Sequence, residues 1–239
     1  GFLTLRLAIS GFGRIGRMTL RAFQEMQRKD MEIVLINSPG PIETSAHLYE
    51  FDSLHGRAEG IIAHGDDWMD IGVGKMHMSR ERDPVDIPHA KLGVDIVLEC
   101  SGKFNNRDAS AAHLVAGAKK VLVSAPCKNA DQTIVYGVNH TDLAAESNVV
   151  SNASCTTNCL APVAKVLADT VGIEAGYMTT IHAYTGDQPT LDSSHSDLRR
   201  ARAAAISMIP TSTGATKAVG EVLPQLQGRM NGSAIRVPT

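Results

Sequence analysis

The chain has 239 residues, enough for two domains, and its 43% hydrophobic and 20% charged residues are ordinary values for a globular protein. A formal net charge of −2 and few aromatic residues argue against nucleic-acid binding, and no apolar run reaches the roughly 18 residues of a membrane span. Four cysteines are too few for a disulfide scaffold, so we expect a reducing, cytoplasmic setting.

The N-terminal residues have the pattern of a β-α-β unit. A strand predicted at residues 5–9 is followed by the glycine-rich segment GFGRIG at 11–16, by apolar residues at helical spacing, and by a second strand at 33–36. The glycines allow a tight turn and let backbone amides approach a pyrophosphate at the helix N-terminus. The acidic residue that usually binds the ribose is missing, because the second strand ends in Asn37 and Ser38. A plain glycine turn in a structural α/β domain is the alternative interpretation.

Strand-like and helix-like stretches continue to alternate, which predicts a mostly parallel, doubly wound sheet. Further strands are expected at residues 69–78, 94–98, 121–123 and 133–136, with a helix at 107–116.

The character of the sequence changes near residue 151. We expect a helix at about 156–168, a strand at about 173–182, and a polar stretch without regular structure at 183–202, a length that usually indicates function. We therefore place the domain boundary at 154, with a nucleotide-binding domain of the Rossmann type at 1–154 and a second domain at 155–239.

A cysteine stands at the start of the second domain's first predicted helix. The helix N-terminus favours a thiolate at Cys155, whereas Cys159 lies one turn further on, where the dipole has faded. His182 ends a predicted strand and would serve as a general base if it lay beside Cys155. The alternatives are a small buried cysteine and a structural histidine. No metal site is expected, because the two cysteines have no second pair of ligands at zinc-finger spacing.

Hydroxyl and guanidinium groups near the C-terminal end suit phosphate. Residues 211–214, Thr-Ser-Thr-Gly, offer hydroxyls and amides in a row, and Arg199 and Arg236 are fork-shaped donors. For Arg200 and Arg202 we favour a solvated face or an interface salt bridge.

Together these motifs resemble the phosphorylating glyceraldehyde-3-phosphate dehydrogenase family. The resemblance rests on SNASCTTNC at 151–159, GFGRIG at 11–16, HAYTGDQ at 182–188, IPTSTGA at 209–215 and RVPT at 236–239, in that order. It implies a Rossmann-type doubly wound parallel sheet and a second, α+β catalytic domain. It also implies oxidation of glyceraldehyde 3-phosphate with NAD or NADP and inorganic phosphate, through a thioester on Cys155, with His182 as base.

The resemblance carries further site residues over to this sequence. It implies one phosphate site from Thr185, Asp187, Arg199 and Arg236, and a second from Ser154, Thr156, Thr213, Gly214 and Arg236. It implies cofactor contacts from Gly11, Gly13, Arg14, Ile15, Gly16, Asn37, Ser38, Arg82, Ser101, Gly102 and Ser124.

Three features depart from the family pattern. Ser10 stands in place of the usual asparagine and Ser38 in place of the ribose-binding aspartate, and the chain is roughly a hundred residues shorter than the family's usual length. The second domain is therefore expected to be incomplete at its C-terminal end, and a homotetramer is expected for a full-length chain. Three alternatives stay open at this point: an erythrose-4-phosphate dehydrogenase, an inactive truncated nucleotide-binding fragment, and a cysteine hydrolase, which the nucleotide-binding loop disfavours.

Overall fold

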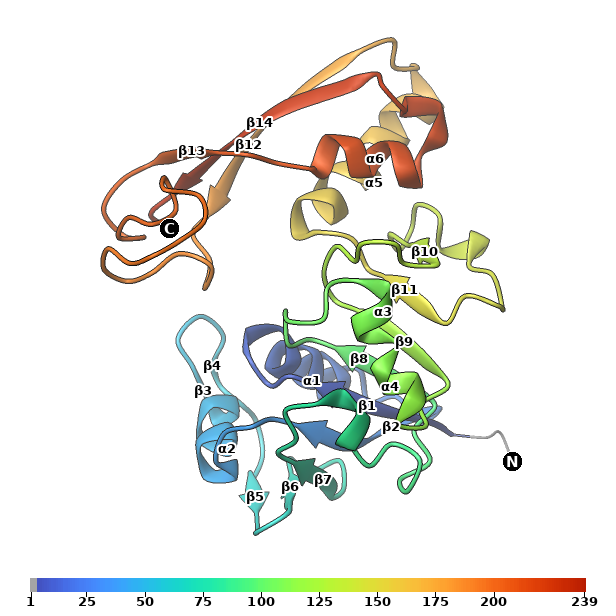
Figure 1. Ribbon diagram of the computed structural model, residues 1–239, viewed down its shortest axis with the longest axis vertical. Coiled ribbons are helices and arrows are strands. Elements are labelled where there is room, and N and C mark those ends of the chain that lie inside the picture. The colour runs from blue at the N-terminus through green and yellow to red at the C-terminus, as the bar shows by residue number, and fades with distance from the viewer. Residues whose placement is uncertain (1–3) are drawn as a thin grey trace. The chain divides into compact units, whose positions relative to one another are not determined.

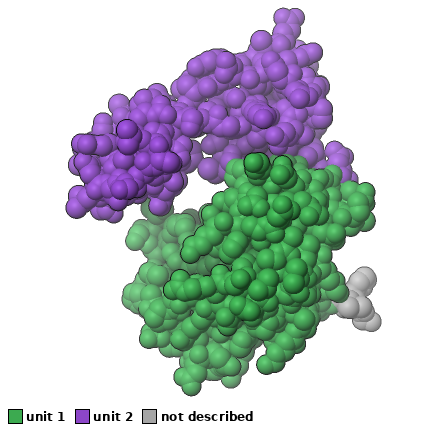
Figure 2. Space-filling view, in the orientation of Figure 1, with its two compact units in different colours: residues 1–134, 143–153 green, residues 135–142, 154–239 purple. Residues whose placement is uncertain are grey.

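The computed structural model describes residues 4–239, which divide into two compact units (Figures 1 and 2). Unit 1 comprises residues 1–134 and 143–153, and unit 2 comprises residues 135–142 and 154–239. The division expected at residue 154 did not foresee that residues 135–142 cluster with unit 2. None of the helices in the described chain is long and apolar enough to cross a membrane.

Unit 1 is built on a nine-stranded sheet with the strand order β10-β11-β9-β8-β1-β2-β7-β6-β5 (Figure 1). Every pairing is parallel except those of β5 with β6 and β6 with β7. The strands are β1 (Leu5–Ser10), β2 (Met31–Asn37), β5 (Ala63–His64), β6 (Trp68–Asp70), β7 (Met76–Ser79), β8 (Ile96–Glu99), β9 (Lys120–Val123), β10 (Gln132–Thr133) and β11 (Val149–Ser151).

The helices and a hairpin complete unit 1. They are α1 (Arg14–Met26), α2 (Ile42–Glu50), α3 (Arg107–Ser110), α4 (Ala112–Val115), the 3₁₀ turn Pro84–Asp86, and the strands β3 (Phe51–Asp52) and β4 (Gly56–Arg57). Alternate residues of β1 enter different cores, with Leu7 and Ile9 in one cluster and Ala8 in the other. A sheet buried on both faces is what a doubly wound fold requires, so the predicted fold class is confirmed.

Three predicted elements of unit 1 are wrong in detail. The strand expected at 69–78 is two strands, because Gly72 and Gly74 adopt positive φ and donate their amides to the Asp70 carboxylate, which turns the chain. The strand expected at 133–136 ends at Thr133, and a turn at residues 136–139 follows, with Gly137 at φ 81°. The helix expected at 107–116 is split at 111 into α3 and α4.

The carboxyl ends of the parallel strands meet at one edge of the sheet. Ser10 pairs with both Asn37 and Glu99, Asn37 pairs with Ser79, and Glu99 pairs with Val123. The loops that follow these residues therefore gather at that edge, where open α/β sheets bind their ligands.

Close packing explains two glycines of the GFGRIG segment, Gly11 in the loop after β1 and Gly16 in the first turn of α1. Gly11 has φ 90°, and a Cβ there would lie 2.4 Å from the Cα of Ser101. A Cβ on Gly16 would lie 2.1 Å from the carbonyl oxygen of Gly11. Only glycine allows this turn to fold onto the neighbouring strand end.

Unit 2 contains a three-stranded sheet in the order β12-β14-β13 and two helices (Figure 1). Strand β14 (Met230–Val237) pairs in parallel with β12 (Gly176–Ala183) and antiparallel with β13 (Ile209–Thr211). Helix α5 (Cys155–Thr170) packs against α6 (Ala215–Val222), and 3₁₀ turns lie at His140–Asp142 and Pro224–Leu226. The polar stretch at 183–202 was expected to lack helix and strand. In the structure, residues 184–208 form neither helix nor strand.

Three buried ionisable groups form a chain inside unit 1. His89 Nε2 lies 3.0 Å from His113 Nδ1, and His113 Nε2 lies 2.7 Å from the Glu99 carboxylate. The other Glu99 oxygen accepts the amide of Ser101. Burial opposes the charge on Glu99, but the hydrogen bonds from His113 and Ser101 outweigh it and lower the pKa of the carboxyl group. Burial, helped by His113, lowers the pKa of His89 to about 4.

The lowered pKa of His89 predicts a loss of stability in acid. An imidazole that is neutral in the fold but protonated in the unfolded chain stabilises the fold above pH 6.5, and this contribution disappears as the pH falls toward 4. We expect His89 to contribute a decrease in unfolding free energy of up to about 1.4 kcal/mol per pH unit in this window. Urea unfolding between pH 7 and 4.5 measures it.

His89→Leu should flatten this pH dependence, whereas His64→Leu, at an exposed site in the same unit, should not. Equal slopes for the wild type and His89→Leu would contradict the prediction.

Candidate active site

Cys155 is the first residue of α5 and its side chain is exposed. Ser154 caps the helix, because its hydroxyl accepts the amide of Thr157 at 3.0 Å. Ala153, immediately before the cap, has φ 57°, in a left-handed region that residues other than glycine rarely adopt. The turn therefore places the thiol at the helix N-terminus, where backbone amides stabilise negative charge.

His182 lies beside this thiol. The residue is next to last in β12, and its Nε2 is 3.2 Å from the Cys155 Sγ. Its Nδ1 lies 2.6 Å from the carbonyl oxygen of Ala183. Because a carbonyl only accepts, Nδ1 carries the proton in the neutral ring, and the lone pair of Nε2 faces the thiol. This geometry suits proton transfer between sulfur and imidazole.

The four cysteines have different surroundings. Burial raises the pKa of the Cys100 thiol to about 11 and also raises the pKa of Cys127. Cys159 is exposed but lies one turn into α5. Among these four cysteines of the described chain, Cys155 alone has an imidazole nitrogen within hydrogen-bond distance of its sulfur.

Two arginines form a cluster near His182. Arg236 pairs with His182 in the register of β14 and β12, and it donates to the Thr185 hydroxyl at 2.7 Å. Burial, together with the charge of Arg200, lowers the pKa of Arg236. Arg200 donates to the Thr211 hydroxyl at 2.7 Å and to the Asp187 carboxylate at 2.9 Å.

The cluster includes an arginine that the sequence analysis had set aside. Arg200 was expected on a solvated face, but its side chain is mostly covered and contacts Asp187. Arg199, expected in the phosphate site, instead forms a salt bridge with Asp197. The sequence does not distinguish the two adjacent arginines. A turn decides which of them faces the cluster, and in this turn the Arg200 amide donates to the Asp197 carbonyl.

Asp187 is the acidic member of the cluster. Its carboxylate oxygens contact His195 Nε2 at 3.1 Å and Arg200 at 2.9 Å. Burial opposes ionisation, but these hydrogen bonds outweigh it and lower the pKa of Asp187. The carboxylate therefore remains charged and holds Arg200 in place.

The residues expected in the second phosphate site lie at two helix N-termini. Ser154 and half-buried Thr156 stand at the start of α5, while Gly214 is the N-cap of α6 and the Thr213 hydroxyl accepts the amide of Ala215 at 3.2 Å. The two helices contact each other, and helix N-termini bind anions through unpaired amides and the helix dipole.

Cofactor residues expected in unit 1 lie along the carboxyl edge of its sheet. Gly13 caps α1 without a side-chain hydrogen bond, and the first turn of that helix contains no acidic residue. This arrangement fits a pyrophosphate. Ile15 is half exposed beside it, and Gly102 has φ 72° in the loop after β8. Ser124 donates its amide to the Glu99 carbonyl at 3.0 Å.

Two expected cofactor residues are engaged within the protein. Arg14 forms a salt bridge with Asp52, which lowers the pKa of that carboxyl group, and its second guanidinium nitrogen lies 3.0 Å from the other oxygen. Asn37 is buried and its amide bonds to the segment after β7. Arg82, on that same segment, is exposed.

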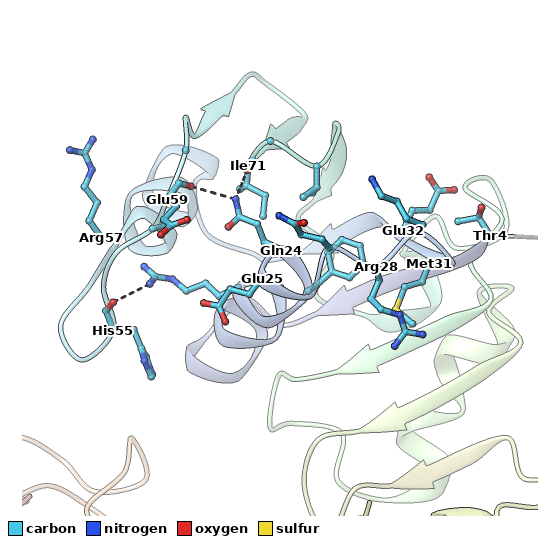
Figure 3. A pocket seen from close by; sticks show the side chains of 18 residues that line it. Thr4, Gln24, Glu25, Arg28, Met31, Glu32, His55, Arg57, Glu59 and Ile71 are labelled. Atoms are coloured by element: carbon cyan, nitrogen blue, oxygen red, sulfur yellow. Dashed lines mark hydrogen bonds between the residues drawn. The ribbon is translucent and has the colours of Figure 1, made fainter.

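A cavity of about 1200 Å³ in unit 1 lies apart from these residues (Figure 3). Residues from the C-terminal half of α1 and from the loops around 55–60 and 71–73 line it. The buried Arg21 guanidinium there donates to the carbonyls of Tyr49 and Gly56, so it joins α1 to the β3–β4 hairpin. None of the expected site residues lines this cavity.

Comparisons with known proteins agree with these features. Residues 5–107 match the family model "Glyceraldehyde 3-phosphate dehydrogenase, NAD binding domain", and residues 154–239 match "Glyceraldehyde 3-phosphate dehydrogenase, C-terminal domain". The chain is 64% identical to the glyceraldehyde-3-phosphate dehydrogenase of Xanthobacter flavus, 62% to that of Cereibacter sphaeroides and 54% to that of Pseudomonas aeruginosa. Each alignment covers 99% of this chain and 71% of the relative.

The thiol environments predict selective alkylation. At neutral pH, iodoacetate should modify Cys155 first, because only this sulfur combines exposure, a helix N-terminus and an adjacent imidazole. Cys100 and Cys127 should react slowly because burial keeps them protonated. Peptide mapping after partial reaction identifies the modified residue.

His182→Asn should slow this alkylation, whereas His140→Asn, at an exposed site of the same unit, should leave it unchanged. Faster labelling of Cys159 than of Cys155 would overturn the assignment.

Proposed function

The chain belongs to the glyceraldehyde 3-phosphate dehydrogenase family, and we propose that it oxidises glyceraldehyde 3-phosphate to an acyl phosphate through a thioester on Cys155. The observation that carries this proposal is the 3.2 Å contact between the Cys155 sulfur and the unprotonated Nε2 of His182. The chain is an NAD-dependent oxidoreductase of this family.

The first half of the reaction forms the thioester. Transfer of the thiol proton to His182 leaves a thiolate, which attacks the aldehyde carbon and forms the C–S bond. The His182 imidazolium returns that proton to the former carbonyl oxygen, which becomes a hydroxyl, and Nε2 is unprotonated again. His182 then accepts the hydroxyl proton while the substrate carbon loses a hydride. Bound NAD supplies the acceptor for that hydride. The Cys155 amide, at the start of α5, would stabilise the developing oxyanion.

The second half consumes inorganic phosphate. A phosphate oxygen attacks the thioester carbonyl, the C–O bond forms, and the C–S bond breaks to restore the Cys155 thiolate. Two anions must be held in unit 2, the substrate phosphate and the attacking phosphate. We assign one to the cluster of Thr185, Asp187, Arg200 and Arg236, and the other to the N-termini of α5 and α6.

The residues of unit 1 fit the dinucleotide. The uncapped first turn of α1 would hold the pyrophosphate, and Gly11 and Gly16 leave room for the backbone turn that exposes these amides. Erythrose 4-phosphate is a less favoured substrate, since the similar relatives are named for glyceraldehyde 3-phosphate.

We also propose a homotetrameric assembly and a cytoplasmic location. Large apolar side chains are exposed in unit 2, among them Tyr177, Ile181, Leu191 and Leu198, and they support the homotetramer expected for a full-length chain. The four unbridged cysteines support a cytoplasmic location.

Removal of the base provides the test. His182→Asn should slow acylation about 10²- to 10⁴-fold and leave NAD affinity unchanged, because the imidazole acts on the proton and not on the dinucleotide. The rate is measured as NADH formation in the presence of glyceraldehyde 3-phosphate and phosphate. Omission of phosphate should leave a covalent acyl group on Cys155, visible in an intact mass spectrum.

His140→Asn serves as the matched control and should retain the wild-type rate. Turnover without an acyl adduct on Cys155, or full activity of His182→Asn, would contradict the mechanism.

A further inference from the structure

His195 is a mostly covered histidine that takes no part in the reaction steps derived above. It lies in the irregular stretch between β12 and β13, and 17% of its side chain is exposed. Its Nδ1 accepts the amide of Asp197 at 2.9 Å. Because a backbone amide only donates, the neutral ring carries its proton on Nε2, which lies 3.1 Å from the Asp187 carboxylate. The backbone therefore fixes His195 as a hydrogen-bond donor to Asp187.

Asp187 connects His195 to the anion-binding cluster. One carboxylate oxygen faces the imidazole, and the other accepts Nη1 of Arg200 at 2.9 Å. A carboxylate with both oxygens free tends to form two parallel bonds with a guanidinium group, the fork geometry that arginine prefers. Here the imidazole takes one of the two oxygens. Arg200 consequently contacts this carboxylate through a single nitrogen.

This single bond leaves the rest of the Arg200 guanidinium free to point elsewhere. Its Nε donates to the Thr211 hydroxyl of β13 at 2.7 Å, which fixes the plane of the group. Its Nη2 has only a long contact, 3.4 Å, with the carbonyl oxygen of Ser212. A contact of that length is weak. The Nη2 donor is therefore available to a bound anion.

Arg236 supplies the second cation of the cluster. It donates to the Thr185 hydroxyl at 2.7 Å and to the Gln188 side chain at 3.3 Å, and within residues 4–239 it forms no salt bridge. The charge of Arg200 contributes to its lowered pKa, so the two guanidinium groups lie close enough to repel each other. An anion bound between them would relieve this repulsion.

The chemistry decides which anion suits the cluster. The attacking phosphate must reach the carbon bonded to the Cys155 sulfur, and α5 begins at Cys155. The helix N-termini therefore suit the attacking phosphate, and the arginine cluster suits the phosphate at the other end of the substrate.

We propose that His195 is a positioning residue for the substrate phosphate: through Asp187 it holds Arg200 in the orientation that binds this phosphate together with Arg236. His195 itself does not contact the substrate. Without the imidazole, Asp187 would turn both oxygens toward Arg200 and draw the guanidinium away from Thr211 and from the phosphate. This inference rests on the proposed function, which assigns a phosphate to the cluster.

Two substrates test the proposal, glyceraldehyde 3-phosphate and D-glyceraldehyde, the same aldehyde without the phosphate. Each is measured with NAD and inorganic phosphate. His195→Ala should lower kcat/KM for glyceraldehyde 3-phosphate about 10-fold, mainly through KM, and change the value for glyceraldehyde less than about twofold. His195→Phe, which keeps the ring volume without the donor, should show the same loss. His195→Gln should recover most of the activity, because its amide nitrogen can donate to Asp187.

Ser196→Ala is the matched control, at the exposed position beside His195, and should behave like the wild type. A second variant tests whether His195 acts through Arg200. In an Arg200→Gln background, His195→Ala should cause no further loss, because the group that it positions is already absent. Circular dichroism verifies that each variant is folded.

Binding of glycerol 3-phosphate, measured by isothermal titration, gives the same comparison without turnover. His195→Ala should weaken this binding about 10-fold, and His195→Gln should restore it. Unchanged binding in His195→Ala and His195→Phe overturns the inference, as does a failure of the folded wild type to bind glycerol 3-phosphate.

The kinetic outcomes separate this inference from the proposed function. Equal losses on both substrates, or additive losses in the Arg200→Gln background, overturn the inference and leave the function intact. A folded wild type that binds glycerol 3-phosphate but does not oxidise glyceraldehyde 3-phosphate contradicts the proposed function, and the titrations of the variants then decide whether His195 positions the anion site.

Discussion

The chemistry of unit 2 depends on the parallel register between β12 and β14. This register pairs His182 with Arg236, so a base and an anion-binding side chain occupy neighbouring positions at the ends of two strands. A shift of one residue would turn either side chain to the opposite face of the sheet. Because β14 also pairs with β13, the same strand aligns Thr211, the partner of Arg200, with the cluster. One strand thus positions the groups to which we assign the chemistry.

Hydrogen bonding determines what each imidazole can do. In His182, Nδ1 carries the proton and donates a hydrogen bond to the Ala183 carbonyl. This leaves Nε2 as an acceptor toward the thiol. In His195 the Asp197 amide donates to Nδ1, so Nε2 carries the proton and donates to Asp187. The two neutral tautomers are opposite, and so are their roles: one histidine is available as a base, while the other holds a carboxylate.

Local signals in the sequence were sufficient for the β1–α1–β2 unit and for the start of α5. A glycine loop between apolar runs and a serine cap before a cysteine each depend on residues close in the chain. Strand β14 was not predicted, because its polar, glycine-containing sequence becomes a strand only through pairing with β12 and β13. For the same reason the turn that selects Arg200 over Arg199 could not be predicted, because it depends on contacts formed by the folded chain.

Carboxylates close to the anion-binding elements are held in ion pairs or hydrogen bonds. Asp52 is paired with Arg14 of the glycine loop, Asp187 with Arg200, and Glu99 with His113 and the Ser101 amide. Each partner lowers the pKa of its carboxyl group, so these groups stay ionised at neutral pH while their charges are compensated nearby. Compensation of this kind matters because a helix N-terminus contributes only about half a unit of positive charge, which a single unpaired carboxylate would cancel. The sites of both units can therefore attract phosphate groups although the chain as a whole is slightly acidic.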